Sequence, residues 1–299
     1  MTTVTWKTVI KWTWILLVAG FVGYYAYSRQ DLIAESLGRL GWPAVLGATI
    51  AIALAKIALA ENMRLALRRT KVTIAFRDCF CIYNLSQIAK YVPGSIWQFV
   101  SRIAMLRERE IALPAIRDSI LAEHAWVLAT ALLFGVALVA FSDPAWLAGA
   151  ADRLPVVESV VAAALAALIA LVIALTSPGR RFLCWAWSLK PGVYAVFVLL
   201  VSWVLLGSAF WVTFLPFTEA PPHWLYFIGL YCLAYLAGFL APFAPAGLGV
   251  REAVLVAGTG AILGADLAIL LAAVNRVIYL FVESVWAGVC MASPRPAGH

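Results

Sequence analysis

Long apolar stretches, separated by short polar or proline-containing segments, make up most of this chain. A run of roughly 20 apolar residues is what an α-helix needs to cross the hydrocarbon core of a bilayer. The pattern therefore predicts an all-α, polytopic membrane helix bundle with about seven or eight spans. The clearest predicted spans are residues 9–27, 43–60, 117–141, 155–176, 193–215, 223–241 and 266–290.

Two further apolar segments are interrupted or short, and they predict re-entrant or broken helices. Residues 78–97 lie between two basic segments, so we expect this segment to enter and leave the membrane on the same side. Residues 251–264 are too short for a full span and fit a half-helix. With these two segments included, residues 1–299 are predicted to form a single transmembrane domain.

Basic residues cluster in two of the predicted loops, which we place at 61–77 and 98–117. Short cytoplasmic loops of membrane proteins are enriched in Lys and Arg, so both loops are predicted to be cytoplasmic, as is the N-terminus. The predicted loops at 28–42, 142–154 and 216–222 are poor in these residues and are placed outside. Lys56, within a predicted span, is expected to reach toward water with its long side chain.

Composition excludes a soluble globular protein. The mean hydropathy is +0.94 and 12% of residues are charged, whereas about 25% is usual in soluble domains. The net charge of +7 comes from basic residues in short loops, so it reflects membrane topology and predicts no nucleic-acid partner. The predicted location is a bacterial-type cytoplasmic (inner) membrane.

Known signatures of soluble catalysis and cofactor binding are missing from the sequence. There is no P-loop, no nucleophile elbow and no dinucleotide fingerprint, so we expect no ATP-driven pump, no catalytic residues and no cofactor. Cys79 and Cys81 form a C-x-C pair without nearby partner ligands and are predicted to be core residues, not a metal site. The first apolar run follows Lys7 and Lys11 but lacks a signal-peptide cleavage site, which predicts a retained span.

Two similar proline-containing motifs interrupt the apolar pattern, one at residues 90–98 and one at 242–252. Aligned on Pro93 and Pro245, they share the order aromatic, small or apolar, Pro, small, small, aliphatic. Pro and Gly break helices, and a break at membrane depth survives only inside protein or beside a wet cavity. Paired breaks in the two halves of a membrane protein indicate a transport site, in a repeat that is either parallel or inverted.

The first motif combines a polar helix face with a helix break. Asn84, Gln87 and Lys90 are spaced by three residues and lie on roughly one face. Such a face is costly in hydrocarbon unless it borders a cavity. A helix that begins near Ser95 would present free backbone N–H groups to an anion. With Arg102, these groups predict a cradle for a phosphate headgroup; an interfacial loop with a snorkelling Lys is the alternative.

The second motif places Gly247 and Gly249 directly before Arg251 and Glu252. A carboxylate in the first turn of a helix is favoured by the helix dipole, whereas an Arg there is not. Arg251 therefore needs another partner, either a carboxylate or a lipid phosphate, and a simple ion pair with Glu252 is the alternative. Glu123 likewise needs a cation, and Lys90, Arg102 and Arg251 are the candidates.

In the last predicted span, Asn275, Arg276 and Glu283 interrupt an apolar helix, and Arg276 and Glu283 share one face. They form either a polar wall of a pathway or a network that holds the bundle together. The predicted substrate-binding residues are Asn84, Gln87, Lys90, Tyr91, Pro93, Gly94, Trp97, Gln98, Arg102, Glu123, Pro245, Gly247, Gly249, Arg251, Glu252 and Arg276.

These motifs resemble the lysylphosphatidylglycerol synthase transmembrane-region family, a flippase-like membrane domain. The resemblance rests on Q-x-x-K-Y-V-P-G-x-x-W-Q (Gln87 to Gln98), on Arg102 and Glu123, and on P-x-x-P-A-G-L-G-V-R-E (Pro242 to Glu252). The sequence has Pro-Ala-Gly where the family often has Pro-Gly-Gly, which keeps the turn chemistry. Bifunctional members carry a soluble aminoacyl-transferase domain, and because this sequence ends at His299, lysyl-lipid synthesis is not implied.

The resemblance implies passive or gradient-linked movement of a polar lipid between leaflets. The implied partner is a membrane lipid of the phospholipid, polyprenyl-linked glycolipid or hopanoid type, with lipid-biosynthesis enzymes as further partners. A membrane enzyme or accessory subunit of lipid glycosylation, and a scaffold in a lipid-synthesis complex, are the alternative functions.

Overall fold

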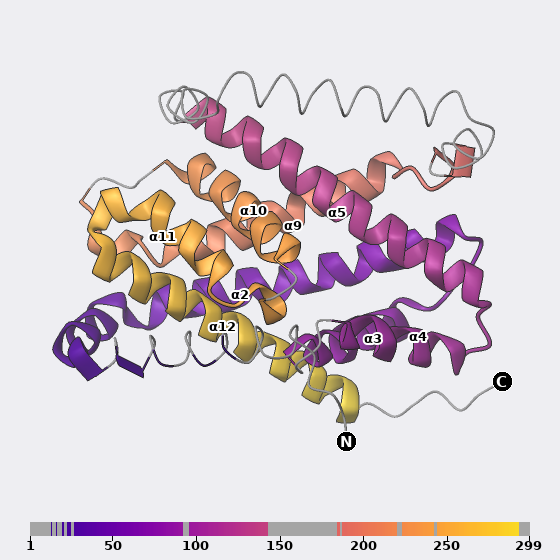
Figure 1. Ribbon diagram of the computed structural model, residues 1–299, viewed down its shortest axis with the longest axis horizontal. Coiled ribbons are helices and arrows are strands. Elements are labelled where there is room, and N and C mark those ends of the chain that lie inside the picture. Colours follow the sequence, from indigo (N-terminus) through magenta and orange to yellow (C-terminus); the bar gives the residue numbers. More distant parts are fainter. Residues whose placement is uncertain are drawn as a thin grey trace.

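The structure is a computed structural model that describes residues 27–91, 96–142, 187–219, 223–241 and 244–292, plus positions 13, 16, 20, 23, 24, 184 and 185. Every regular element in these residues is a helix, as the sequence predicts (Figure 1). The predicted span at 155–176 and most of the one at 9–27 lie outside the described residues, as do Pro93 and Gly94.

The helices keep the order of the apolar stretches. They are α2 (Gln30–Arg69), α3 (Phe76–Ile88), η1 (Ala89–Tyr91), α4 (Trp97–Arg107), α5 (Leu113–Ser142), α9 (Val193–Val212), η2 (Leu215–Phe217), α10 (Trp224–Leu240), η3 (Pro245–Gly247), α11 (Val250–Leu263) and α12 (Ala265–Ala292). The elements α9, α10, α11 and α12 agree closely with the spans and the half-helix that the sequence predicts.

Five helical stretches of the described chain are long and apolar enough to cross a bilayer. They are Gln30–Arg69, Leu113–Ser142, Val193–Phe217, Pro245–Leu263 and Ala265–Ala292, and α10 adds a shorter apolar helix. A bilayer core of about 30 Å requires about 20 helical residues at 1.5 Å each. The protein is therefore a multi-pass membrane protein.

The segments 28–42, 61–77 and 98–117, which the sequence predicts to be loops, are largely helical, so these three predictions are wrong. Helix α2 begins at Gln30 and continues to Arg69, and α4 occupies the start of the predicted loop at 98–117. Leu, Glu and Arg, which are frequent in these segments, are good helix formers, so charge ends an apolar run without ending the helix. Helix α2 is instead broken at Gly41, whose φ of 69° is left-handed, two residues before Pro43.

Close approach of backbones holds the bundle together where α5 crosses α10. A Cβ atom on Gly135 would lie 2.9 Å from the Cβ atom of Cys232, and one on Gly229 would lie 2.9 Å from the carbonyl oxygen of Gly135. Small residues at such crossings let membrane helices reach van der Waals contact where no hydrophobic effect drives association. This crossing fixes α10, and with it the start of the second motif.

The two motifs meet in space. The short helices α3 and α4 contact each other on either side of residues 92–95, which lie outside the described chain. Arg109, just after α4, forms a 3.5 Å ion pair with Asp78 at the start of α3. The end of α4 therefore lies beside the start of α3. The short helix η1, which follows α3 in the first motif, contacts η3 of the second motif. In Figure 1, α3 and α4 lie on the right of the view and α11 on the left, with α10 between them.

Candidate functional site

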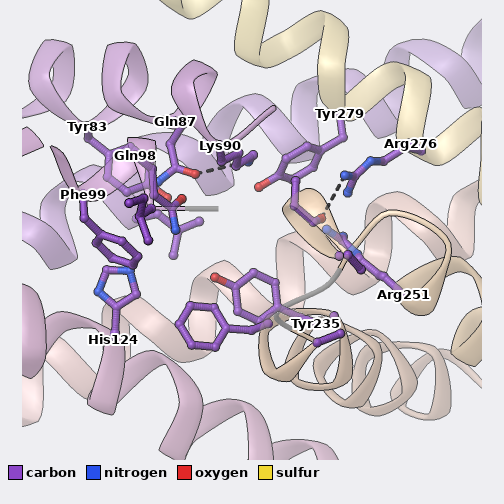
Figure 2. A pocket seen from close by; sticks show the side chains of 18 residues that line it. Tyr83, Gln87, Lys90, Gln98, Phe99, His124, Tyr235, Arg251, Arg276 and Tyr279 are labelled. Atoms are coloured by element: carbon purple, nitrogen blue, oxygen red, sulfur yellow. Dashed lines mark hydrogen bonds between the residues drawn. The ribbon is translucent and has the colours of Figure 1, made fainter. Parts of the chain in front are cut away.

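A cavity of about 260 Å³ opens where the two motifs meet, lined by residues of α2, α3, η1, α4, α5, α10, η3, α11 and α12 (Figure 2). Its size is close to the lower end of small-molecule sites, about 300 Å³. Its walls carry three cations, two amides and a set of aromatic rings. The polar and aromatic lining residues are Tyr83, Gln87, Lys90, Gln98, Phe99, His124, Tyr235, Phe239, Arg251, Arg276 and Tyr279.

Glu283 on α12 joins three elements behind one wall of the cavity. Its carboxylate pairs with Lys56 of α2, accepts a 2.6 Å hydrogen bond from Lys90 of η1, and accepts another of 2.6 Å from the hydroxyl of Tyr91. Lys56 has an exposed fraction of 0%, so the prediction that it reaches toward water is wrong. The reason is that Glu283, 227 positions away, supplies a partner within the bundle.

Glu123 of α5 finds its cation in Arg102 of α4, one of the three candidates that the sequence offered. The Arg102 Nη1 atom donates to Glu123 over 2.7 Å, and Nε donates to the Ser86 hydroxyl over 3.3 Å. Both charged side chains are buried, and neither lines the cavity. Arg102 thus lies behind the wall formed by Tyr83, whose ring it faces at 5.3 Å.

The second motif is a tight turn that lets α11 begin beside the cavity. Ala246, Gly247 and Gly249 have φ values of 52°, 70° and 83°. A Cβ atom on Gly247 would lie 2.9 Å from the Cα atom of Gly238 on α10, so only glycine fits there. Glu252 accepts a 2.7 Å hydrogen bond from the backbone N–H of Gly249, which confirms its expected role at the helix start.

Arg276 of α12 holds this turn from the other side. Its Nη2 atom donates to the carbonyl oxygen of Ala246 over 2.9 Å, and its Nε atom lies 3.7 Å from Glu252. At that distance Nε forms no hydrogen bond, and within the described chain it is a buried donor without an acceptor. Arg276 therefore both supports the turn and lines the cavity.

Among the cations that line the cavity, Arg251 is the one without a polar partner in the described part of the chain. Only 7% of the residue is exposed, and its guanidinium faces the rings of Tyr231 at 4.3 Å and Tyr279 at 5.2 Å. Among the described residues it makes no hydrogen bond and no ion pair, not even with neighbouring Glu252. Aromatic faces stabilise a desolvated cation by about 2 kcal/mol, but they leave its five N–H donors without acceptors.

The remaining predicted residues lie at different depths around the cavity. Asn84 is buried and donates to the backbone of its own helix, and Gln87 accepts a 3.2 Å hydrogen bond from Lys90. Gln98 lines the cavity, whereas Trp97 is 44% exposed and does not. Pro245 is buried in the turn and does not line the cavity.

Sequence reasoning missed the aromatic part of the site. Tyr83, Tyr235 and Tyr279 line the cavity, and His124 of α5 lines it as well. One signal was available: Tyr279 lies three residues after Arg276 and four before Glu283, which places it on the polar face of α12.

Positive charge exceeds negative charge in and directly behind the cavity wall. The cations are Lys56, Lys90, Arg102, Arg251 and Arg276, and the carboxylates are Glu123, Glu252 and Glu283. Among the described residues, five cations against three carboxylates leave two positive charges without compensation. Within the described part of the chain, His, Cys, Asp and Glu side chains form no group that could hold a metal ion. The arrangement is suited to holding an anion.

Comparison with protein-family models finds no match, and a search of curated proteins finds none either.

Proposed function

We propose that this protein is a lipid transporter of the flippase type, and that the cavity binds an anionic headgroup during its passage between leaflets. The observation that carries the proposal is the unpaired, buried Arg251. Placing an Arg at the centre of a membrane helix costs about 2.5–3.5 kcal/mol on insertion scales. A free guanidinium beside a cavity offers that charge to a ligand. The resemblance to the lysylphosphatidylglycerol synthase transmembrane-region family supports the same reading.

Arg251, Arg276 and Lys90 have complementary roles in this proposal. The guanidinium of Arg251 binds two phosphate oxygens as a planar fork. Arg276 lines the cavity from the opposite side of the turn and adds its positive charge. When the ligand binds, Lys90 turns from Glu283 toward the phosphate, and the ion pair with Lys56 still balances the negative charge of Glu283. Two excess positive charges suit a phosphodiester or a phosphomonoester.

The short helices give the headgroup a route that does not cross hydrocarbon. Helices α3 and α4 have 13 and 11 residues, and elements this short leave polar backbone ends inside the membrane, where water or a ligand must satisfy them. In this proposal α3 and α4 form a re-entrant hairpin in a bacterial inner membrane. Their basic flanks lie on the cytoplasmic side, together with the N-terminus.

The test is leaflet exchange in vesicles that contain the purified chain alone. Acyl-labelled phosphatidylglycerol in phosphatidylcholine vesicles should become accessible to a membrane-impermeant quencher faster than in protein-free vesicles, with its mass unchanged. Exchange no faster than in protein-free vesicles would contradict the proposal. A covalently modified lipid would instead support a membrane enzyme of lipid glycosylation.

A further inference from the structure

The cavity has two chemically different ends, and the second end has no role in phosphate binding. In Figure 2, Arg251 and Arg276 lie at one end, while Gln98, Phe99 and His124 lie at the other, with Lys90 and Tyr235 between them. The second end combines amide groups with ring faces. It can therefore bind a part of the headgroup that is distinct from the phosphate.

His124 presents a hydrogen-bond acceptor at this second end. Its Nδ1 atom lies 2.8 Å from the carbonyl oxygen of Ile120. Since a carbonyl oxygen only accepts, Nδ1 must carry the proton, and the neutral imidazole then has a lone pair on Nε2. The ring is held by contacts with Phe99 at 5.0 Å and Phe239 at 5.7 Å.

The two amides add both donors and acceptors. The side-chain oxygen of Gln87 accepts the hydrogen bond from Lys90, and its NH₂ group remains available to donate to a ligand. Gln98 lines the cavity, and its side chain has no hydrogen-bond partner among the described residues. An imidazole lone pair and amide groups beside aromatic faces match hydroxyl groups, which both donate and accept.

The second end is unsuited to an ammonium group. None of the described residues that line the cavity is Asp or Glu, and Glu123, next to His124 in sequence, is already paired with Arg102. The uncompensated positive charge of the first end lies within the same small cavity. An ammonium group on the ligand would be repelled by this positive charge, and no cavity-lining carboxylate among the described residues would offset the repulsion.

We infer that the cavity selects a headgroup in which a phosphate is joined to an uncharged, hydroxyl-bearing group, and that it disfavours headgroups carrying an ammonium. The inference rests on the proposed function, because it assigns a substrate class to the same cavity. In it, Arg251 and Arg276 bind the phosphate, and His124 with Gln98 binds the hydroxyl groups.

The experiment compares acyl-labelled phosphatidylinositol, phosphatidylglycerol and phosphatidylethanolamine, each as a tracer in phosphatidylcholine vesicles containing the full chain. The two hydroxyl-bearing lipids should exchange at least about tenfold faster than phosphatidylethanolamine. Equal rates for all three, or a faster ethanolamine lipid, would overturn the inference and leave lipid transport standing. No exchange of any lipid above protein-free vesicles would instead remove the proposed function itself.

The variant His124→Phe keeps the ring and its aromatic neighbours but removes the acceptor. The ratio of phosphatidylinositol to phosphatidylethanolamine exchange should fall about three- to tenfold, as expected for one lost hydrogen bond. Because the ratio is measured in one preparation, loss of folded protein cannot produce it. An unchanged ratio would remove His124 from headgroup recognition and overturn this assignment.

Discussion

At the scale of single residues, the most demanding feature is the fully buried Lys56 beside Glu283. Removing one partner of a buried ion pair leaves an uncompensated charge and costs about 3–5 kcal/mol, whereas replacing both is often nearly neutral. We therefore expect Glu283→Gln to lower the melting temperature of the purified protein strongly and Lys56→Met/Glu283→Gln to recover only part of the loss, because Lys90 still lacks its carboxylate partner. Additive losses in the double variant would show that the pair is not coupled.

Arg102 and Arg251 are both buried arginines, but their surroundings predict different defects. Arg102 is paired with Glu123 behind the cavity, so Arg102→Ala should reduce the amount and melting temperature of the protein. Leaflet exchange per folded molecule should then change by no more than about twofold, a size within the range of a surface substitution. A tenfold loss of exchange at normal stability would restore Arg102 to the phosphate site that the sequence motifs suggest.

At the scale of elements, the crossing of α5 and α10 should tolerate no added atoms. Gly135→Ala places a methyl group 2.9 Å from the Cβ atom of Cys232, and overpacking of this kind costs about 1–3 kcal/mol. Gly288→Ala on α12 is the matched control, because its methyl group would meet nothing within 4 Å. Thermal unfolding in detergent should show a lower melting temperature for Gly135→Ala only. Equal melting temperatures would mean that this crossing is loosely packed.

The positions of the helices also show how much of the fold the local pattern of apolar and polar residues can predict. Apolar runs place α9, α10 and α12 well, because burial in a membrane requires length and hydropathy that a local window contains. Helix ends were misjudged where charged helix formers follow an apolar run, as between Glu61 and Arg69 in α2. The Lys56–Glu283 pair could not be predicted, because it joins residues 227 positions apart and depends on how α2 packs against α12.

At the scale of the whole molecule, the re-entrant hairpin that we propose for α3 and α4 predicts a topology that labelling can check. The end of α2, the start of α3 and the turn after α4 lie together through the Asp78–Arg109 ion pair. The other end of α2 lies beside η2, where Arg39 donates to the carbonyl oxygen of Pro216. Cysteines at Arg69 and Arg109 in a cysteine-free background should therefore react from the same, cytoplasmic side, and one at Glu219 from the opposite side. Labelling of Arg69 and Arg109 from opposite sides would rule out a re-entrant hairpin.

The central claim is that Arg251 is left unpaired in order to bind the headgroup phosphate. The most direct measurement is phosphatidylglycerol exchange per folded protein for Arg251→Lys, Arg251→Ala and Arg251→Ala/Glu252→Ala, with the surface variant Arg117→Lys as control. Since Lys lacks the planar fork and a charge-assisted hydrogen bond is worth about 1.5–3 kcal/mol, Arg251→Lys should lose at least about tenfold in exchange, and Arg251→Ala more. Arg117→Lys should match the native protein. Native rates in Arg251→Lys, or full recovery in the double variant, would show that Arg251 only balances Glu252 and would contradict the account.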